Sequence, residues 1–230
     1  MEHGFSWVQQ IPGLNLLEPH TATALIVMVG LLLFALRARQ QLATAGNQVV
    51  PDEGFSARNI GEVVTEFITN LSESVIGHDG PKYVPLFGSL FVFILGSNLM
   101  GLIPGFTPPT DNFNVTLALG VVAFVAYNYY GLQAHGIAYL KQFMGPLLLL
   151  APLMIVVELF SHLFRPASLA IRLYGNMFAD HLLLGIFTDL TKVLIPVIFY
   201  LLGTFVSLVQ ALVFTLLTMV YVGLAISHDH

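Results

Sequence analysis

The stretch R-P-A-S-L-A-I-R-L-Y-G-N-M-F-A-D-H, from Arg165 to His181, decides how the rest of the chain is organised. It lies within a long apolar run, yet it contains two arginines, an aspartate and a histidine. An arginine at the centre of a bilayer costs roughly 2.5–3.5 kcal/mol on insertion scales, and charged groups kept there mark functional sites. Arg172 is therefore the first candidate site residue.

The composition is that of an integral membrane protein. Of the 230 residues, 56% are hydrophobic and only 9% are charged, whereas soluble domains carry about 25% charged residues. The apolar runs are continuous rather than alternating, which favours membrane helices over a barrel. We expect an all-α fold, one membrane domain over residues 1–230. With no cysteine and scattered histidines, no metal, cofactor or nucleic-acid partner is predicted.

Five membrane helices are predicted along the chain. Residues 18–40 form the first span, and residues 41–82 a polar segment that contains an amphipathic helix. Residues 83–133 form a hairpin of two spans joined by a Pro/Gly-rich loop at 104–112. Residues 146–226 form a last helical hairpin, which carries the candidate site.

The last hairpin is too long to stand upright in a membrane. Its apolar runs, 146–188 and 193–226, would measure about 64 and about 51 Å as helices, against a hydrocarbon core about 30 Å thick. The helices must be broken, strongly tilted or laid nearly in the membrane plane. A short link at 188–192 makes them antiparallel. Four residues predict bends: Pro166, Gly175, Pro196 and Gly203.

The amphipathic helix in the polar segment has three possible settings. It can lie on the membrane surface, pack on a partner helix or present an ordinary packed face, and periodicity alone leaves these open. The apolar residues at helical spacing are Ile60, Val63, Val64, Phe67, Ile68, Leu71 and Val75.

Basic residues predict the orientation. Cytoplasmic loops carry an excess of Lys and Arg, and the first twenty residues and the loop at 104–112 contain none. We therefore expect the amino terminus outside, residues 41–82 in the cytoplasm and, after five crossings, the carboxyl terminus inside. The basic residues between the first and second spans are Arg37, Arg39, Arg58 and Lys82.

Polar residues form stripes on both helices of the last hairpin. At 100° per residue Ser168, Arg172 and Asn176 share one face. Arg172 lies about eighteen residues before the turn near residue 190, and Gln210 about twenty after it, so an antiparallel pair places them side by side. Gln210 could hydrogen-bond the guanidinium without neutralising it.

A permanent cation with no carboxylate one helical turn away suggests a carboxylate supplied by another chain. Near Arg172 such a group would release its proton, and in lipid it would be neutral. Glu158, Asp180 and His181 are candidate access groups for the ion.

Plainer interpretations remain open for each of these residues. Arg172 can be buried against a carboxylate of its own chain, and Asp180 with His181 can be a simple polar cap. Gln210 can be an ordinary interhelix contact, worth about 0.6 kcal/mol on average. Arg165 is interpreted as a membrane anchor.

Several motifs together resemble subunit a of F-type ATP synthases. The segment 168–181, S-L-A-I-R-L-Y-G-N-M-F-A-D-H, is similar to the family signature S-L-x-x-R-L-x-x-N. Two earlier segments resemble the family's central hairpin and the loop after it, and they occur in the family's order. They are N-L-M-G-L-I-P-G (98–105) and Gly136 to Phe143. The segment 208–222, L-V-Q-A-L-V-F-T-L-L-T-M-V-Y-V, resembles its last helix.

The resemblance implies a function and its partners. Subunit a lies beside a rotating ring of c subunits in the bacterial inner membrane, with a b-subunit stator stalk and lipid as further partners, and ATP chemistry occurs on other subunits. Arg172 would force each ring carboxylate to deprotonate and prevent a proton short circuit between two half-channels. Asn176 and Gln210 would line the path, and Glu158, Ser168 and His181 are candidate channel residues.

The chain departs from the family pattern at one place. Many bacterial members carry an acidic residue at the position of His181 and a histidine at that of Gly203. The adjacent Asp180 is therefore expected to have taken over the acidic function.

The alternative function is a secondary ion transporter with a midplane site. That class favours inverted repeats with paired broken helices, and the two halves of this chain differ in span length and polarity. A purely structural scaffold does not explain Arg172.

Overall fold

The fold consists of helices alone over the residues that the computed structural model describes, which are 7–10, 16–44, 56–136, 139, 151–190 and 194–227. Three short 3₁₀ turns are η1 (Trp7–Gln10), η2 (Gly80–Tyr83) and η3 (Pro109–Asp111). The α-helices are α1 (Pro19–Thr44), α2 (Ala57–Ile76), α3 (Val84–Met100), α4 (Phe113–His135), α5 (Ala151–Leu190) and α6 (Leu194–Ile226).

Five stretches in the described part of the chain are long and apolar enough to cross a membrane, as predicted. The first helix continues beyond the predicted 18–40 to Thr44, past the two arginines near its end. The candidate spans are Pro19–Ala43, Gly80–Met100, Phe113–His135, Leu153–Thr188 and Pro196–Ile226.

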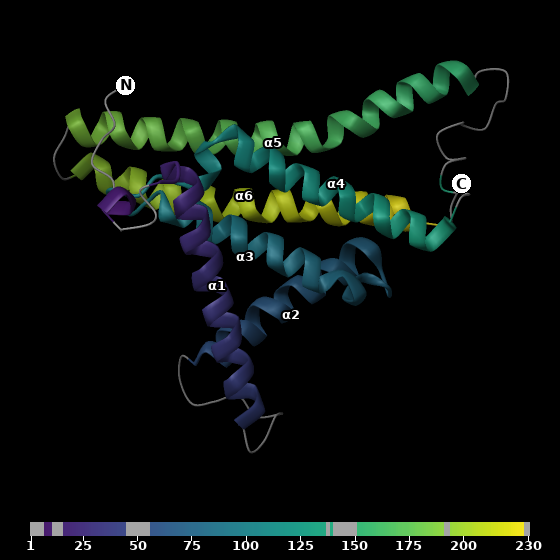
Figure 1. Ribbon diagram of the computed structural model, residues 1–230, viewed down its shortest axis with the longest axis horizontal. Coiled ribbons are helices and arrows are strands. Elements are labelled where there is room, and N and C mark those ends of the chain that lie inside the picture. The colour runs from purple at the N-terminus through teal and green to yellow at the C-terminus, as the bar shows by residue number, and fades with distance from the viewer. Residues whose placement is uncertain are drawn as a thin grey trace.

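The two long helices are continuous over their described residues, so of the three predicted alternatives the broken form does not apply. α5 runs for 40 residues with Pro166 inside it, and α6 for 33 residues, which makes them about 60 and about 50 Å long. α5 curves along its length, whereas α1 runs across the direction of α5 and α6 (Figure 1). With α1 taken to cross the bilayer, the long pair runs at a large angle to the membrane normal, and strong tilt stays a prediction of how these helices lie in the membrane.

Side-chain contacts fix the register of the antiparallel pair. The guanidinium of Arg165 lies 5.5 Å from the ring centroid of Tyr221. Near the other end, the rings of Phe187 and Phe199 stack with centroids 4.3 Å apart. Part of the predicted link at 188–192 lies outside the described residues.

The amphipathic helix α2 packs mainly within the chain. Ser56 caps its start by accepting a hydrogen bond from the amide of Asn59, and Ile68 is fully buried in the core shared with α3 and α6. A second apolar strip stays exposed, with Val63 at 65% and Phe67 at 43%. The interpretation as a packed face is thus confirmed for one side of the helix.

Helix α4 lies close against α5 because of a glycine. A Cβ added at Gly120 would come within 2.7 Å of the Pro166 carbonyl oxygen. Small residues at helix contacts allow such backbone approach in membranes. The core between these helices and α3 includes Phe87, Ile94, Tyr127 and Leu173, each 1% exposed or less. This packing holds α5 so that its opposite face points outward.

Candidate functional site

Arg172 lies on the outward face of α5. Its neighbours Leu169, Leu173 and Met177 are buried against the rest of the bundle, at 3% exposure or less, while Arg172 itself is exposed. Within the described ranges no hydrogen bond or ion pair reaches its guanidinium. The alternative of an intrachain carboxylate partner therefore finds no support among those residues.

Gln210 lies beside Arg172, as the predicted register requires. The two side chains line one small hollow between α5 and α6, together with four apolar residues. Among the described residues no hydrogen bond joins the two side chains. The structure therefore places Gln210 next to Arg172 without the predicted hydrogen bond. The apolar lining consists of Leu169, Leu173, Val213 and Phe214.

The stripe predicted on α5 is present and flanked by apolar surface. Ser168 and Asn176, one turn to either side of Arg172, are both exposed. Ile171 is 58% exposed next to them, and Phe205 of α6 is 63% exposed. A permanent cation thus stands on a largely apolar surface, and in a membrane span it is this charge, rather than the apolar surface, that indicates a functional site.

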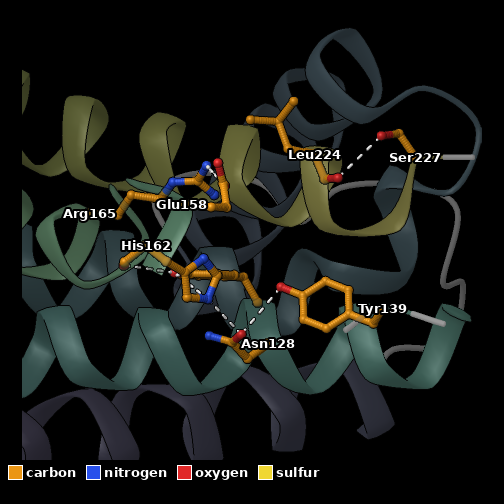
Figure 2. A network of polar contacts seen from close by, with 8 residues as sticks. Asn128, Tyr139, Glu158, His162, Arg165, Leu224 and Ser227 are labelled. Carbon is orange, nitrogen blue, oxygen red and sulfur yellow. Dashed lines mark hydrogen bonds and ion pairs between the residues drawn. The ribbon is translucent and has the colours of Figure 1, made fainter. Parts of the chain in front are cut away.

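A first polar cluster lies toward the amino-terminal end of α5. Glu158 forms an ion pair with Arg165, with 3.6 Å between Oε1 and Nη2, and both side chains are partly exposed (Figure 2). Arg165 also lies over the ring of Tyr221. Arg165, which the sequence suggested as a simple anchor, therefore links α5 to α6, and Glu158 faces it rather than Arg172.

His162 stands at the centre of the same cluster. Its Nε2 lies 2.8 Å from Asn128 Oδ1, and the Tyr139 hydroxyl donates to that same oxygen (Figure 2). The Asn128 amide nitrogen donates to the Phe124 carbonyl, which orients its oxygen toward the histidine. Because amide oxygens only accept hydrogen bonds, His162 carries its proton on Nε2 in this arrangement.

The continuity of α5 through Pro166 has a local cause. Proline has no amide hydrogen, so the carbonyl of residue i−4, here His162, loses its helical partner. The buried hydroxyl of Tyr127 donates to that carbonyl oxygen at 3.4 Å. A neighbouring helix thus satisfies the group that the proline frees.

We expect Tyr127→Phe to destabilise the protein by about 1–3 kcal/mol, because the His162 carbonyl is left buried without its donor. Thermal unfolding in detergent measures this, at about 2–4 °C of Tm for each kcal/mol. The matched control is Tyr129→Phe, since Tyr129 is 61% exposed. An equal Tm for both variants contradicts the prediction.

Asp180 belongs to a second polar cluster, toward the carboxyl-terminal end of α5. A Cβ added at Gly203 of α6 would lie 2.8 Å from Asp180 Oδ2 and 2.9 Å from Leu102 Cδ2. The carboxylate therefore occupies space next to the missing side chain of Gly203. The structure thus places Asp180 next to Gly203, while its acidic function in place of residue 181 stays a prediction.

His181 faces a residue that the sequence analysis did not select. Its Nδ1 lies 3.0 Å from Oδ2 of Asp111 in η3, and the Asp111 side chain is only 12% exposed. Asp180 and His181 therefore do not form a simple polar cap. Asp111 lies 70 residues earlier in the chain, so helical periodicity could not reveal this contact.

A buried polar chain continues from the same turn into the bundle. The Thr110 hydroxyl donates to Asn98 Oδ1 at 2.7 Å, and the Asn98 amide donates to the Ser207 carbonyl at 3.2 Å. All three residues are fully buried. Ser207 lies one helical turn from Gln210, so this chain leads from η3 toward Arg172. The sequence signal was Asn98 itself, a polar residue inside an apolar span.

The two clusters lie on opposite sides of Arg172 along α5. Arg165 is seven residues before it, or about 10 Å along the axis, and Asp180 eight residues after it, or about 12 Å. Both clusters contain carboxylates and a histidine. Among the residues that the structure describes, no group of three or more His, Cys, Asp or Glu side chains is arranged to hold a metal ion.

Comparisons with known proteins identify the family of the chain. The family model of the ATP synthase A chain matches residues 21–223. ATP synthase subunit a of Bdellovibrio bacteriovorus is 47% identical over 98% of this chain and 99% of the relative. That of Geobacter sulfurreducens is 42% identical over 94% and 95%, and subunit a 1 of Pelobacter propionicus 42% over 89% and 86%. The chain therefore belongs to the ATP synthase A chain family.

Proposed function

We propose that this chain translocates protons through the membrane sector of a rotary F-type ATP synthase. The observation that carries the proposal is Arg172, exposed on an apolar surface beside Gln210 and unpaired within the described residues. A guanidinium cannot deprotonate, and since no described residue supplies its counter-charge, we assign that charge to a partner subunit. Family membership favours this function over the alternative of a secondary transporter.

The partner that fits is a ring of c subunits, each with a carboxylate. Beside Arg172 that carboxylate is stabilised as the anion, so its proton is released, whereas in contact with lipid the neutral acid is favoured. Rotation therefore couples to one proton per carboxylate. The same fixed cation keeps protons from passing directly between the two sides.

Two half-channels reach the arginine from opposite ends of α5. The cluster around Glu158 and His162 supplies polar groups on one side, and Asp180 with His181 on the other. Ser168 and Asn176 continue these paths along the exposed stripe. The charge rule assigns the Glu158 end to the cytoplasm and the Asp180 end to the outside.

The same arguments give the setting of the chain. It is a multi-pass subunit of the bacterial inner membrane, with its amino terminus outside and its carboxyl terminus in the cytoplasm. The b-subunit stator stalk and lipid contact it, and ATP chemistry occurs on other subunits. The direct test is the loss of ATP-driven proton pumping when Arg172 is replaced.

We expect Gln210→Leu to slow ATP-driven proton pumping severalfold without abolishing it. Gln210 adds a hydrogen-bonding group beside Arg172 but carries no charge, and a single interhelix polar contact contributes about 0.6 kcal/mol on average. Initial pumping rates in inverted vesicles measure the change. Thr204→Val on the exposed side of the same helix is the control. Wild-type rates for Gln210→Leu would remove this residue from the path.

A further inference from the structure

We propose that Asp111 is the outermost proton-carrying group of the outer half-channel and that it delivers protons to His181. This rests on the proposed function and adds a residue to it. The two side chains come from η3 and α5, and Asp111 Oδ2 lies 3.0 Å from His181 Nδ1. A proton can pass directly between groups at this separation.

Asp111 stands where it can connect the loop surface to the interior. Its side chain is 12% exposed, and that of His181 is 39% exposed. The backbone amide of Asp111 donates to the Pro108 carbonyl at 3.1 Å, and the preceding Thr110 is anchored to Asn98. The carboxylate is therefore held at a fixed position by a turn that is itself tied to α3.

One oxygen of Asp111 remains available for a further hydrogen bond. Oδ1 is buried and has no hydrogen-bond partner among the described residues, while Oδ2 faces His181. A carboxylate that served only as a structural tie would be expected to use both oxygens, because buried polar atoms without partners are rare. The unpartnered Oδ1 can accept a hydrogen bond from a further group of the path, while the transferred proton leaves through Oδ2, which faces His181.

The transfer can be written as two balanced steps. The protonated carboxyl of Asp111 gives its proton to His181 Nδ1, which leaves a carboxylate and an imidazolium. The imidazolium then releases the proton on Nε2 toward the inner part of the path, where Asp180 is adjacent, and becomes neutral with its remaining proton on Nδ1. The ring returns to the Nε2-protonated tautomer before it accepts the next proton. Water on the outside recharges Asp111. The two ring nitrogens let histidine accept a proton on one side and release it on the other.

Among the described residues, the titratable groups near this pair include members of α1 and α5. α1 contributes His20, whose Nδ1 lies 3.4 Å from the Pro108 carbonyl oxygen, and the exposed Glu18. α5 contributes Asp180. The facing residues of α3 and α4, Asn98 and Asn112, do not titrate. The effect of substituting Asp111 on the pH dependence of ATP synthesis can therefore be compared with the effects of substituting these neighbours.

The test uses Asp111→Asn in the assembled complex. Asparagine keeps an oxygen that can accept a hydrogen bond from His181 but cannot carry a proton. We expect ATP synthesis driven by outer acidification to fall about tenfold, less than the 10²–10⁴-fold of a buried proton carrier, because water can partly bypass a group at a channel mouth. The outer pH for half-maximal synthesis should move to lower values, with the inner pH dependence unchanged.

Controls separate this from a structural role. Asp111→Glu, which keeps a carboxyl group, should retain most activity. Asp79→Asn, which neutralises an exposed carboxylate paired with Lys82, should have no effect. Unchanged synthesis and outer pH dependence in Asp111→Asn would overturn the proposal. If Arg172→Ala abolishes pumping while Asp111→Asn is silent, only the role of Asp111 fails and the proposed function stands.

Thiol labelling gives an independent measurement. The chain has no cysteine, so Asp111→Cys provides its one thiol. A membrane-impermeant thiol reagent added from the outer side should modify it and block proton flow further. Labelling only from the cytoplasmic side would overturn the placement of Asp111 at the outer mouth.

Discussion

Arg172→Ala is expected to abolish ATP-driven proton pumping, a loss of at least about 10²-fold. Without the guanidinium, a ring carboxylate that reaches α5 has no cation to favour its anionic form, and in apolar surroundings it stays protonated. The proton then remains on the ring, and rotation no longer releases it. The other arginine of α5, Arg165, is already engaged with Glu158 and Tyr221 and does not substitute.

Acidification of inverted vesicles, followed with a pH-sensitive dye during ATP hydrolysis, measures this loss. The control is Arg39→Ala, which removes an exposed arginine near the end of α1. A second readout is passive proton flow through membranes stripped of the catalytic subunits, which should not fall in parallel if the arginine also separates the half-channels. Pumping retained in Arg172→Ala would exclude the mechanism.

The sequence predicted those parts of the site that depend on helical repetition. The spacing of Ser168, Arg172 and Asn176 placed them on one face, and the position of the turn placed Gln210 beside the arginine. Both inferences need only a regular helix and a short link, and the structure places these residues accordingly. The amphipathic helix followed from periodicity in the same way.

Other parts of the site depend on contacts between distant segments. Asp111 faces His181 from a 3₁₀ turn, and no repeat in the sequence encodes that proximity. Pro166 predicted a bend, and α5 curves along its length yet stays continuous through the proline, because the Tyr127 hydroxyl from α4 satisfies the carbonyl that proline frees. Glu158 was predicted as an access group on the path to Arg172, whereas it pairs with Arg165, about two helical turns away along α5.

Asp180→Asn is expected to reduce proton flux by about 10²-fold, the lower end of the effect of a positioned proton carrier. The carboxylate lies between His181 and the part of α6 that carries Gly203, eight residues from Arg172 on α5. Asparagine fills the same space and is also polar, but it cannot carry a proton. The loss of flux therefore measures the role of Asp180 as a proton carrier rather than its role in packing. Pumping rates and ATP synthesis rates measure it in both directions of rotation.

The control for charge is Glu18→Gln, which neutralises an exposed carboxylate just before α1, and equal activity of the two variants would count against Asp180. The variant Gly203→Ala distinguishes a steric effect on Asp180 from the loss of its charge. Its Cβ would come within 2.8 Å of Asp180 Oδ2 and 2.9 Å of Leu102 Cδ2, both ends of side chains that can move. We therefore expect a smaller, severalfold loss in Gly203→Ala. If Asp180→Asn were mild and Gly203→Ala severe, the carboxylate would be a packing element, and the proton would have to pass from His181 to the ring by another route.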